Sequence, residues 1–189
     1  TVEQLDNDCL CYMSINQQPV KSSRIFLGNM HEIAVRMLNE HFRTTENFYK
    51  NIKYDQEMIN MLKLRYSGDR RAFFSSGHEA REFRQHIDLF DFKSFDEAYH
   101  QLMSELCNLA VDAVNLILPE KDDIANIYIT GGFARNQIFL KLMAKSFPGK
   151  KVYTSVINNA TALGAAIVVL NSMTSEMPQL NLGLTEYQA

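Results

Sequence analysis

Apolar and polar positions along the chain follow two periods, one typical of helices and one typical of strands. The helical period, in which apolar residues recur every three or four positions, begins after Gly28, after Asp55 and after Ser94. The third segment is the longest, and Pro119 follows it. Because serine favours a helix start and proline a helix end, we predict a long helix over 95–118 that lies across a sheet or between layers.

Short β-prone runs predict the strands. Runs at 10–15 and 24–27 flank a polar turn and predict a hairpin. Farther along, an apolar run at 124–129 predicts a buried strand, and 151–154 predicts another. A helix is expected after each of these two strands, and the second, over 160–173, begins with small residues that favour tight packing on the sheet. The second half therefore has the strand–helix alternation of an α/β fold.

The strand at 124–129 is followed at once by Thr130, Gly131 and Gly132. Paired glycines permit positive φ and leave no Cβ between the backbone and a ligand. The helix expected next directs its first N–H groups to the same place, which favours a polar or anionic ligand. Asn136, expected one turn into that helix, offers a donor and an acceptor to a flat heterocycle. The alternative is a tight structural turn with a solvent-facing asparagine.

Composition and charge narrow the class of protein. The 189 residues are 46% apolar and 22% charged, which is typical of a folded domain with a proper core. A net charge of −3 and a pI near 5.9 argue against nucleic-acid and anionic-membrane partners. No apolar run has the length of a membrane span, and the start shows no signal peptide.

The cysteines and histidines predict no metal site. Cys9, Cys11 and Cys107 have no second Cys/His pair that could complete a zinc site, so we expect reduced thiols in the cytoplasm. His31 and His41 are single histidines on the helix predicted after Gly28, and we expect them at the surface or at helix ends.

Two segments together resemble a known family. Residues 127–136 (Ile-Tyr-Ile-Thr-Gly-Gly-Phe-Ala-Arg-Asn) and 160–166 (Ala-Thr-Ala-Leu-Gly-Ala-Ala), with a helix and a strand between them, resemble the C-terminal domain of FGGY carbohydrate kinases. The resemblance implies an α/β fold, a ribonuclease-H-like lobe of the actin-like ATPase superfamily with a mixed sheet flanked by helices. On this basis residues 1–174 form the lobe, and 175–189 form a polar, weakly ordered tail.

The resemblance also implies an adenosine site at the glycine turn. Gly131 and Gly132 would lie against the ribose and the α-phosphate, Asn136 would lie near the adenine or ribose, and Phe133 and Ala134 would shape the pocket. The implied ligands are ATP or ADP and a sugar, with Mg²⁺ held through the ATP phosphates and the other lobe.

The family's catalytic motifs have no counterpart in this chain. Its Asp-x-Gly-x-Ser/Thr phosphate turn is absent, and no aspartate stands in the Gly-x-x-Asp setting of the general base; Asp69 follows Ser67-Gly68 with the wrong spacing. Residues 156–159 also lack the acidic residue that members often carry there. We therefore assign no catalytic residue here, and we expect the base on an N-terminal lobe of the same chain, upstream of Thr1.

The sequence thus predicts the ATP-binding C-terminal portion of a cytoplasmic sugar kinase. The full-length enzyme would transfer the γ-phosphoryl of ATP to a hydroxyl of a ketose or polyol, for example a pentulose, and the isolated fragment would be inactive. One alternative is a non-catalytic nucleotide-binding regulator of the same superfamily, and a kinase assay on the full-length protein would distinguish it from the enzyme. The other is an unrelated α/β interaction domain, and an assay of adenine-nucleotide binding would distinguish it from both nucleotide-binding candidates. The sequence leaves the oligomeric state open.

Overall fold

The structure is a computed structural model of the chain. It describes residues 9–14, 16–66, 71–75, 82–118, 123–155, 157, 159–173 and 181–188. Several positions used above lie outside these ranges: Thr1, 67–69, Pro119, Val156, Asn158 and the part of the tail at 174–180.

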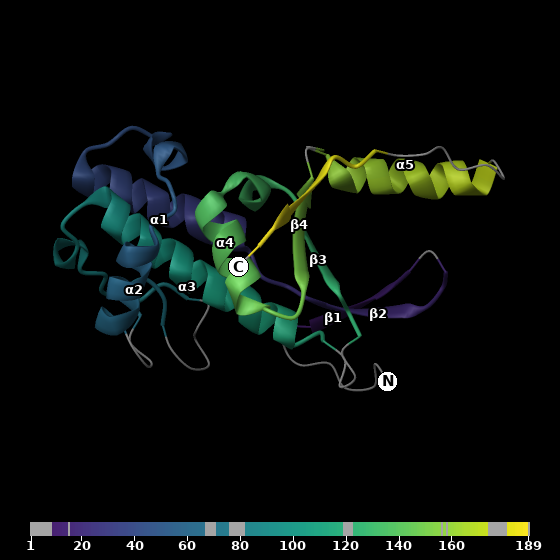
Figure 1. Cartoon of the computed structure of the whole chain (residues 1–189), viewed down its shortest axis with the longest axis horizontal. Coiled ribbons are helices and arrows are strands. Elements are labelled where there is room, and N and C mark those ends of the chain that lie inside the picture. Colours follow the sequence, from purple (N-terminus) through teal and green to yellow (C-terminus); the bar gives the residue numbers. More distant parts are fainter. Residues whose placement is uncertain are drawn as a thin grey trace.

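Four of the helices lie at one end of the molecule, and the strands lie toward the other end together with α5 (Figure 1). The helices are α1 (Leu27–Phe42), α2 (Gln56–Arg65), α3 (Phe95–Asn115), α4 (Gln137–Ser146) and α5 (Ala160–Met173). The strands are β1 (Cys9–Met13), β2 (Pro19–Ser23), β3 (Asn126–Ile129), β4 (Lys151–Ser155) and β5 (Leu184–Tyr187). Helices α1 to α4 pack together as a body, whereas the hairpin and α5 extend from the opposite end, beside the sheet.

The described strands form two sheets. Strands β1 and β2 make the antiparallel hairpin, and the second sheet has the order β3-β4-β5. Strand β3 pairs parallel to β4, with Ile127 opposite Val152, and β4 pairs antiparallel to β5, with Val152 opposite Tyr187. This sheet is therefore mixed, and helices flank it, as the sequence predicted.

The body is built around α3, whose apolar face contacts α1, α2 and α4. Ala98, Tyr99, Leu102 and Leu106 recur at helical spacing along this face and are completely buried. Such burial is the main favourable contribution to folding, about 1.5–3 kcal/mol for each large apolar side chain. The predicted long helix is confirmed, and it ends at Asn115 rather than at residue 118.

Helix caps explain where α2 and α3 begin. The Asp55 carboxylate accepts a hydrogen bond from the Met58 N–H at 3.0 Å, and the Ser94 hydroxyl accepts one from the Glu97 N–H at 3.2 Å. Each bond satisfies an N–H group that the first turn of a helix leaves without a partner. The side chain of Glu97 accepts a hydrogen bond from the N–H of Lys93 at 2.7 Å, one residue before the cap.

The hairpin, β3, α5 and the tail depart from the sequence prediction. The second hairpin strand is Pro19–Ser23 rather than 24–27, because α1 already begins at Leu27. Strand β3 alternates between half-buried and exposed positions instead of being buried, and Tyr128 is 56% exposed. Most of α5 is exposed rather than packed on the sheet, with Met173 at 77%. The tail, predicted to be weakly ordered, contains β5, which gains backbone hydrogen bonds from β4.

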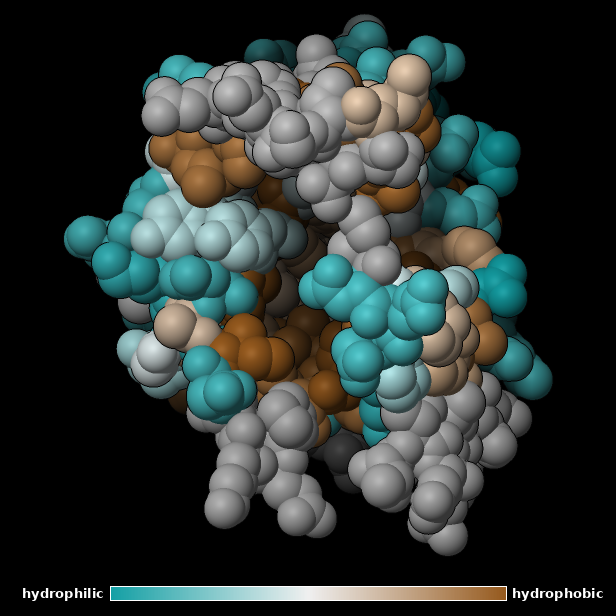
Figure 2. Space-filling view, turned by 90° about the vertical axis from the view of Figure 1, so that its right-hand side faces the viewer, coloured by the Kyte–Doolittle hydropathy of each residue, from teal (hydrophilic) through white to brown (hydrophobic). Residues whose placement is uncertain are grey.

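Exposed apolar side chains gather at the sheet end. Figure 2 shows this face, with apolar residues in brown around a hollow. The exposed large apolar residues on or beside β1, β2, β3, β5 and α5 are Leu10, Tyr12, Met13, Val20, Phe26, Ile124, Tyr128, Val168, Val169, Leu170, Met173, Leu182 and Leu184. A surface of this kind is typical of an interaction site rather than of an isolated solvated face.

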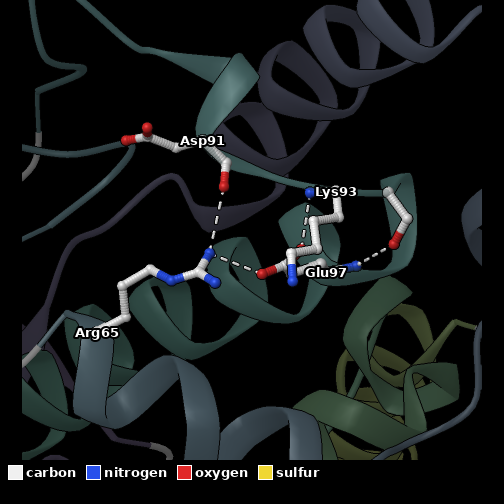
Figure 3. Close-up of polar contacts among 5 residues, drawn as sticks. Arg65, Asp91, Lys93 and Glu97 are labelled. Atoms are coloured by element: carbon white, nitrogen blue, oxygen red, sulfur yellow. Dashed lines mark hydrogen bonds and ion pairs between the residues drawn. The ribbon is translucent and has the colours of Figure 1, made fainter.

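A polar clamp joins α2 to the start of α3 on the opposite, helical side (Figure 3). The Arg65 guanidinium lies 2.7 Å from the Glu97 carboxylate and donates a second hydrogen bond to the Asp91 carbonyl at 3.2 Å. Glu97 is nearly completely buried, so its charge is compensated by this arginine and by the Lys93 N–H. The clamp is far along the chain from the glycine turn, and we assign it to stability.

Candidate functional site

The glycine turn lies at the edge of the sheet where both parallel strands end. Strand β3 ends at Ile129, Gly131 follows with φ +77° and ψ −152°, and Gly132–Arg135 forms a single 3-10 turn before α4. The next parallel strand, β4, ends at Ser155 on the same edge. In α/β proteins ligands bind outside the carboxyl ends of parallel strands, so this turn is placed where a ligand site is expected.

The two glycines face open space. Both are exposed, and a Cβ added to either would meet no atom within 4 Å. Gly131 has a conformation that L-residues rarely adopt, so glycine is required there by the backbone. Gly132 has no such constraint, and its lack of a side chain leaves the approach to the backbone open. The prediction that the turn uses positive φ is confirmed at Gly131.

Phe133 and Ala134 face the opposite way and fix the turn to the protein. The Phe133 ring lies 4.5 Å from the Phe139 ring and 5.6 Å from the His31 ring, measured between centroids. The Ala134 carbonyl accepts a hydrogen bond at 3.1 Å from the hydroxyl of Thr154, near the end of β4. Through these contacts the turn is attached to α1, α4 and β4.

Asn136 is the N-cap of α4, not a residue one turn inside the helix as the sequence predicted. The helix starts later because residues 132–135 form the 3-10 turn first. The Asn136 Oδ1 atom accepts a hydrogen bond from the Phe139 N–H at 3.0 Å. Its Nδ2 donates to the Tyr99 hydroxyl at 2.7 Å and lies 3.8 Å from the sulfur of Met103. A ligand would therefore find one unused lone pair on Oδ1 rather than a free amide.

Tyr99 and His31 continue this hydrogen-bonded chain into the body. The Tyr99 hydroxyl lies 3.0 Å from Nε2 of His31. Burial lowers the pKa of His31 to about 4 and raises the pKa of Tyr99, so both side chains are neutral at physiological pH. Since Asn136 donates to the Tyr99 oxygen, the Tyr99 hydroxyl can donate to Nε2 of His31, which then carries its proton on Nδ1.

Sequence reasoning missed these two residues. His31 was expected at the surface or at a helix end, but it is mostly enclosed among the rings of Tyr49, Tyr99 and Phe133, at 5.0, 5.8 and 5.6 Å. Tyr99 was taken only as part of the apolar face of the long helix. A tyrosine on the buried face of a helix needs a partner for its hydroxyl, and that requirement could have identified Tyr99.

The glycine turn offers open space and hydrogen-bond donors for a ligand. Open space lies over the two glycines, and the N-terminus of α4, which favours anionic groups, follows after the 3-10 turn. In the ranges that the structure describes, no three His, Cys, Asp or Glu residues are grouped so that they could hold a metal ion. The three cysteines are free thiols, as expected, and burial raises the pKa of Cys107 to about 12.

A second hollow lies on the helical body, away from the glycine turn. Its volume is about 530 Å³, and it lies between the segment at 48–58 and the start of α3. His100 borders it, but both ring nitrogens already have partners, the Asp55 N–H at 3.1 Å and the Asp96 carbonyl at 2.7 Å. Nothing in this hollow indicates a particular ligand. Across the described part of the chain, no helix combines the length and the hydrophobicity that a membrane span requires.

Comparison with known proteins supports the fold. No protein-family model matches the sequence, and no curated protein matches it. A carbohydrate kinase from Novosphingobium aromaticivorans has a similar structure, with a TM-score of 0.61 and 17% sequence identity over 96% of this chain. The similar region is 35% of the kinase chain, so the present chain spans about a third of that protein's length. The chain therefore has a kinase-like mixed α/β fold.

Proposed function

We propose that this chain is the ATP-binding portion of a carbohydrate kinase of the FGGY type, with a ribonuclease-H-like fold. The full-length protein would transfer the γ-phosphoryl of ATP to a hydroxyl of a ketose or polyol in the cytoplasm. The observation that carries the proposal is the glycine turn at the carboxyl edge of β3 and β4, open over Gly131 and Gly132. Support comes from the carbohydrate kinase that shares this fold.

Each part of the turn has a role in this proposal. Gly131 and Gly132 allow the ribose and α-phosphate to approach the backbone, because no side chain stands over them. The first N–H groups of α4 favour the phosphate charge. Phe133 and Ala134 fix the shape of the turn, and Asn136 holds its end while offering one lone pair to the adenine or ribose. Mg²⁺ would be held by the ATP phosphates and by residues outside this chain.

An N-terminal lobe would complete the enzyme. The chain corresponds to 35% of the similar kinase, and most of its exposed large apolar residues lie at the sheet end (Figure 2). We propose that the upstream lobe of the same protein covers part of this face and supplies the catalytic base. Phosphoryl transfer requires in-line positioning, a metal and a proton acceptor, and closure of two lobes around the substrates excludes water.

Gly132→Val tests the proposed site in the full-length protein. A Cβ added at Gly132 meets no atom within 4 Å, so we expect the fold to remain intact, whereas the side chain would occupy the space over the turn. We expect ATP affinity to fall by at least about 100-fold, roughly 2.7 kcal/mol, in a titration with Mg-ATP. Gly131→Val is less informative because it also strains the backbone at φ +77°.

Gly149→Val is the matched control. Gly149 also has open space around its Cβ position, but it precedes β4 and so lies at the opposite edge of the sheet from the glycine turn. We expect this variant to bind ATP as the unmodified protein does. Equal affinity in the Gly132→Val and Gly149→Val variants would show that the turn is not the nucleotide site. ATP binding without sugar phosphorylation would instead support a regulator.

A further inference from the structure

We propose that Tyr99 and His31 are positioning residues for the nucleotide turn, acting through Asn136. The inference rests on the proposed function. It adds a line of side-chain contacts that runs from the turn, through Tyr99 on α3, to His31 on α1. Neither residue needs to touch the nucleotide. Their effect is to hold the end of the glycine turn in one conformation, which lowers the conformational entropy lost when a ligand binds.

The first step of the argument is that the direction of the Asn136 amide is fixed. Its Oδ1 accepts from the Phe139 N–H, a backbone donor whose position is set by α4, so Nδ2 must point to the Tyr99 hydroxyl. The backbone of Asn136 also closes the 3-10 turn, because its N–H donates to the Phe133 carbonyl at 3.0 Å. A change in Asn136 is therefore transmitted directly to the residues that follow Gly131.

The second step is that Tyr99 has no freedom to move. Its side chain is completely buried on α3, where the hydroxyl can meet both Asn136 and His31. Loss of the hydroxyl would remove a partner from two half-buried polar groups, the His31 Nε2 and the Asn136 Nδ2, and would leave the latter with only the weak contact to the Met103 sulfur. Such groups are costly to bury unsatisfied, so the surrounding segments would shift to recover hydrogen bonds.

The third step is that His31 also holds the turn from a second side. Its ring contacts Phe133, which is the residue after the two glycines, and Tyr99 at the same time. The backbone N–H and carbonyl groups of 131–136 are thus fixed by a hydrogen bond at Asn136 and by a ring contact at Phe133. Both of these supports meet in the single pair His31–Tyr99.

The test uses Tyr99→Phe in the full-length protein, because this change removes only the hydroxyl. We expect Mg-ATP affinity to fall by about tenfold, the scale of one lost buried hydrogen bond. Ile59→Val is the control, since Ile59 is buried on α2, outside the chain of contacts, and its truncation lowers stability in a similar way. That control should bind ATP within about twofold of the unmodified protein.

A double-mutant cycle distinguishes positioning through Asn136 from a general loss of stability. Asn136→Ser can still accept from the Phe139 N–H as a cap, but it cannot donate to Tyr99. In that background we expect Tyr99→Phe to change affinity by less than about threefold, because the contact is already absent. Full additivity of the two changes would overturn the inference.

Hydrogen exchange at the Ala134, Asn136 and Phe139 amides provides a readout without nucleotide. Exchange should be faster at these three amides in Tyr99→Phe and unchanged there in Ile59→Val. Failure of the unmodified protein to bind ATP would refute the proposed function. The hydrogen-exchange rates of the three amides would then decide whether Tyr99 and His31 position the turn. Unchanged exchange, or ATP affinity within twofold for Tyr99→Phe, would overturn the inference while leaving the proposed site intact.

Discussion

The helical body and the sheet end of this molecule differ in how far their apolar side chains are buried. In the body, Leu102 and Leu106 of α3 are completely buried, and the exposed large apolar residues there are Phe48, Met61, Leu64 and Phe90. At the sheet end, exposed apolar side chains occur on both strands of the hairpin, on β3, on β5 and along α5. The body thus has a core made by its own helices, whereas many apolar side chains of the sheet end are exposed.

The apolar core and the candidate site lie in different parts of the molecule. Residues that make the core lie mainly between α1, α2, α3 and α4, and the candidate site lies where α4 meets β3 and β4. The His31–Tyr99–Asn136 chain connects the two regions through part-buried hydrogen bonds. Substitutions in the two regions should therefore have different consequences, and these consequences test the comparison.

The largest effect on stability is expected for Leu106→Ala in the body. Leu106 is completely buried on α3, so its truncation removes apolar contacts and leaves a cavity, at a cost of about 2–5 kcal/mol in the free energy of unfolding. The control is Leu184→Ala on β5, where the side chain is 44% exposed and the loss should be below about 1 kcal/mol. Urea unfolding measures both. Similar losses at the two positions would remove the distinction between the regions.

An intermediate effect is expected from the protonation of His31, at the boundary between the regions. Burial lowers its pKa to about 4, whereas the unfolded chain has a value near 6.5. Between these values the unfolded state binds more protons, so stability falls as the pH is lowered from about 6.5 to about 4, by up to roughly 3 kcal/mol. Above pH 6.5 this contribution is constant.

Comparison with His31→Gln isolates this contribution. Glutamine can still accept from the Tyr99 hydroxyl but does not titrate, so the difference in unfolding free energy between the two proteins should decrease as the pH falls. The raised pKa of Glu105, caused first by burial, has the opposite sign: it makes stability fall as the pH rises above the ordinary glutamate value. This contribution of Glu105 is the same in the unmodified protein and in the His31→Gln variant, so it cancels in the difference. A pH-independent difference would mean that His31 is not buried as a neutral ring.

The sequence predicted local features better than contacts between distant segments. Apolar periodicity and the caps at Asp55 and Ser94 located the starts of α2 and α3, because both signals are contained in a few neighbouring residues. Strand β5 was missed because its polar sequence becomes a strand only by pairing with β4. The chain from His31 to Asn136 was missed because it forms only where α1, α3 and α4 meet.

In the candidate site, too, the sequence predicted one feature and missed another. The positive φ of Gly131 could be predicted from the Gly-Gly pair alone, since few residues other than glycine adopt it. The position of Asn136 could not, because a 3-10 turn over 132–135 delays the start of α4 and changes which way the amide points. The 3-10 turn places Asn136 at the N-cap of α4, where its amide contacts the Phe139 N–H and the Tyr99 hydroxyl.

The smallest effect on the stability of this chain is expected for Val168→Asp on α5. Val168 is 47% exposed, so a charged side chain there remains in water, and the free energy of unfolding should change by less than about 0.5 kcal/mol. In the full-length protein the proposed N-terminal lobe would cover this face. Burying an unpaired carboxylate there would then be costly, and we expect the melting temperature of the full-length protein to fall clearly.

Val168→Thr is the control for this comparison, because it keeps the shape of valine and replaces one methyl group by a hydroxyl. Its effect on the full-length protein should lie between those of valine and aspartate, and its effect on residues 1–189 alone should be negligible. If aspartate changes the full-length protein no more than it changes this chain, then α5 is exposed in both. The apolar surface of the sheet end would in that case serve a partner other than the upstream lobe.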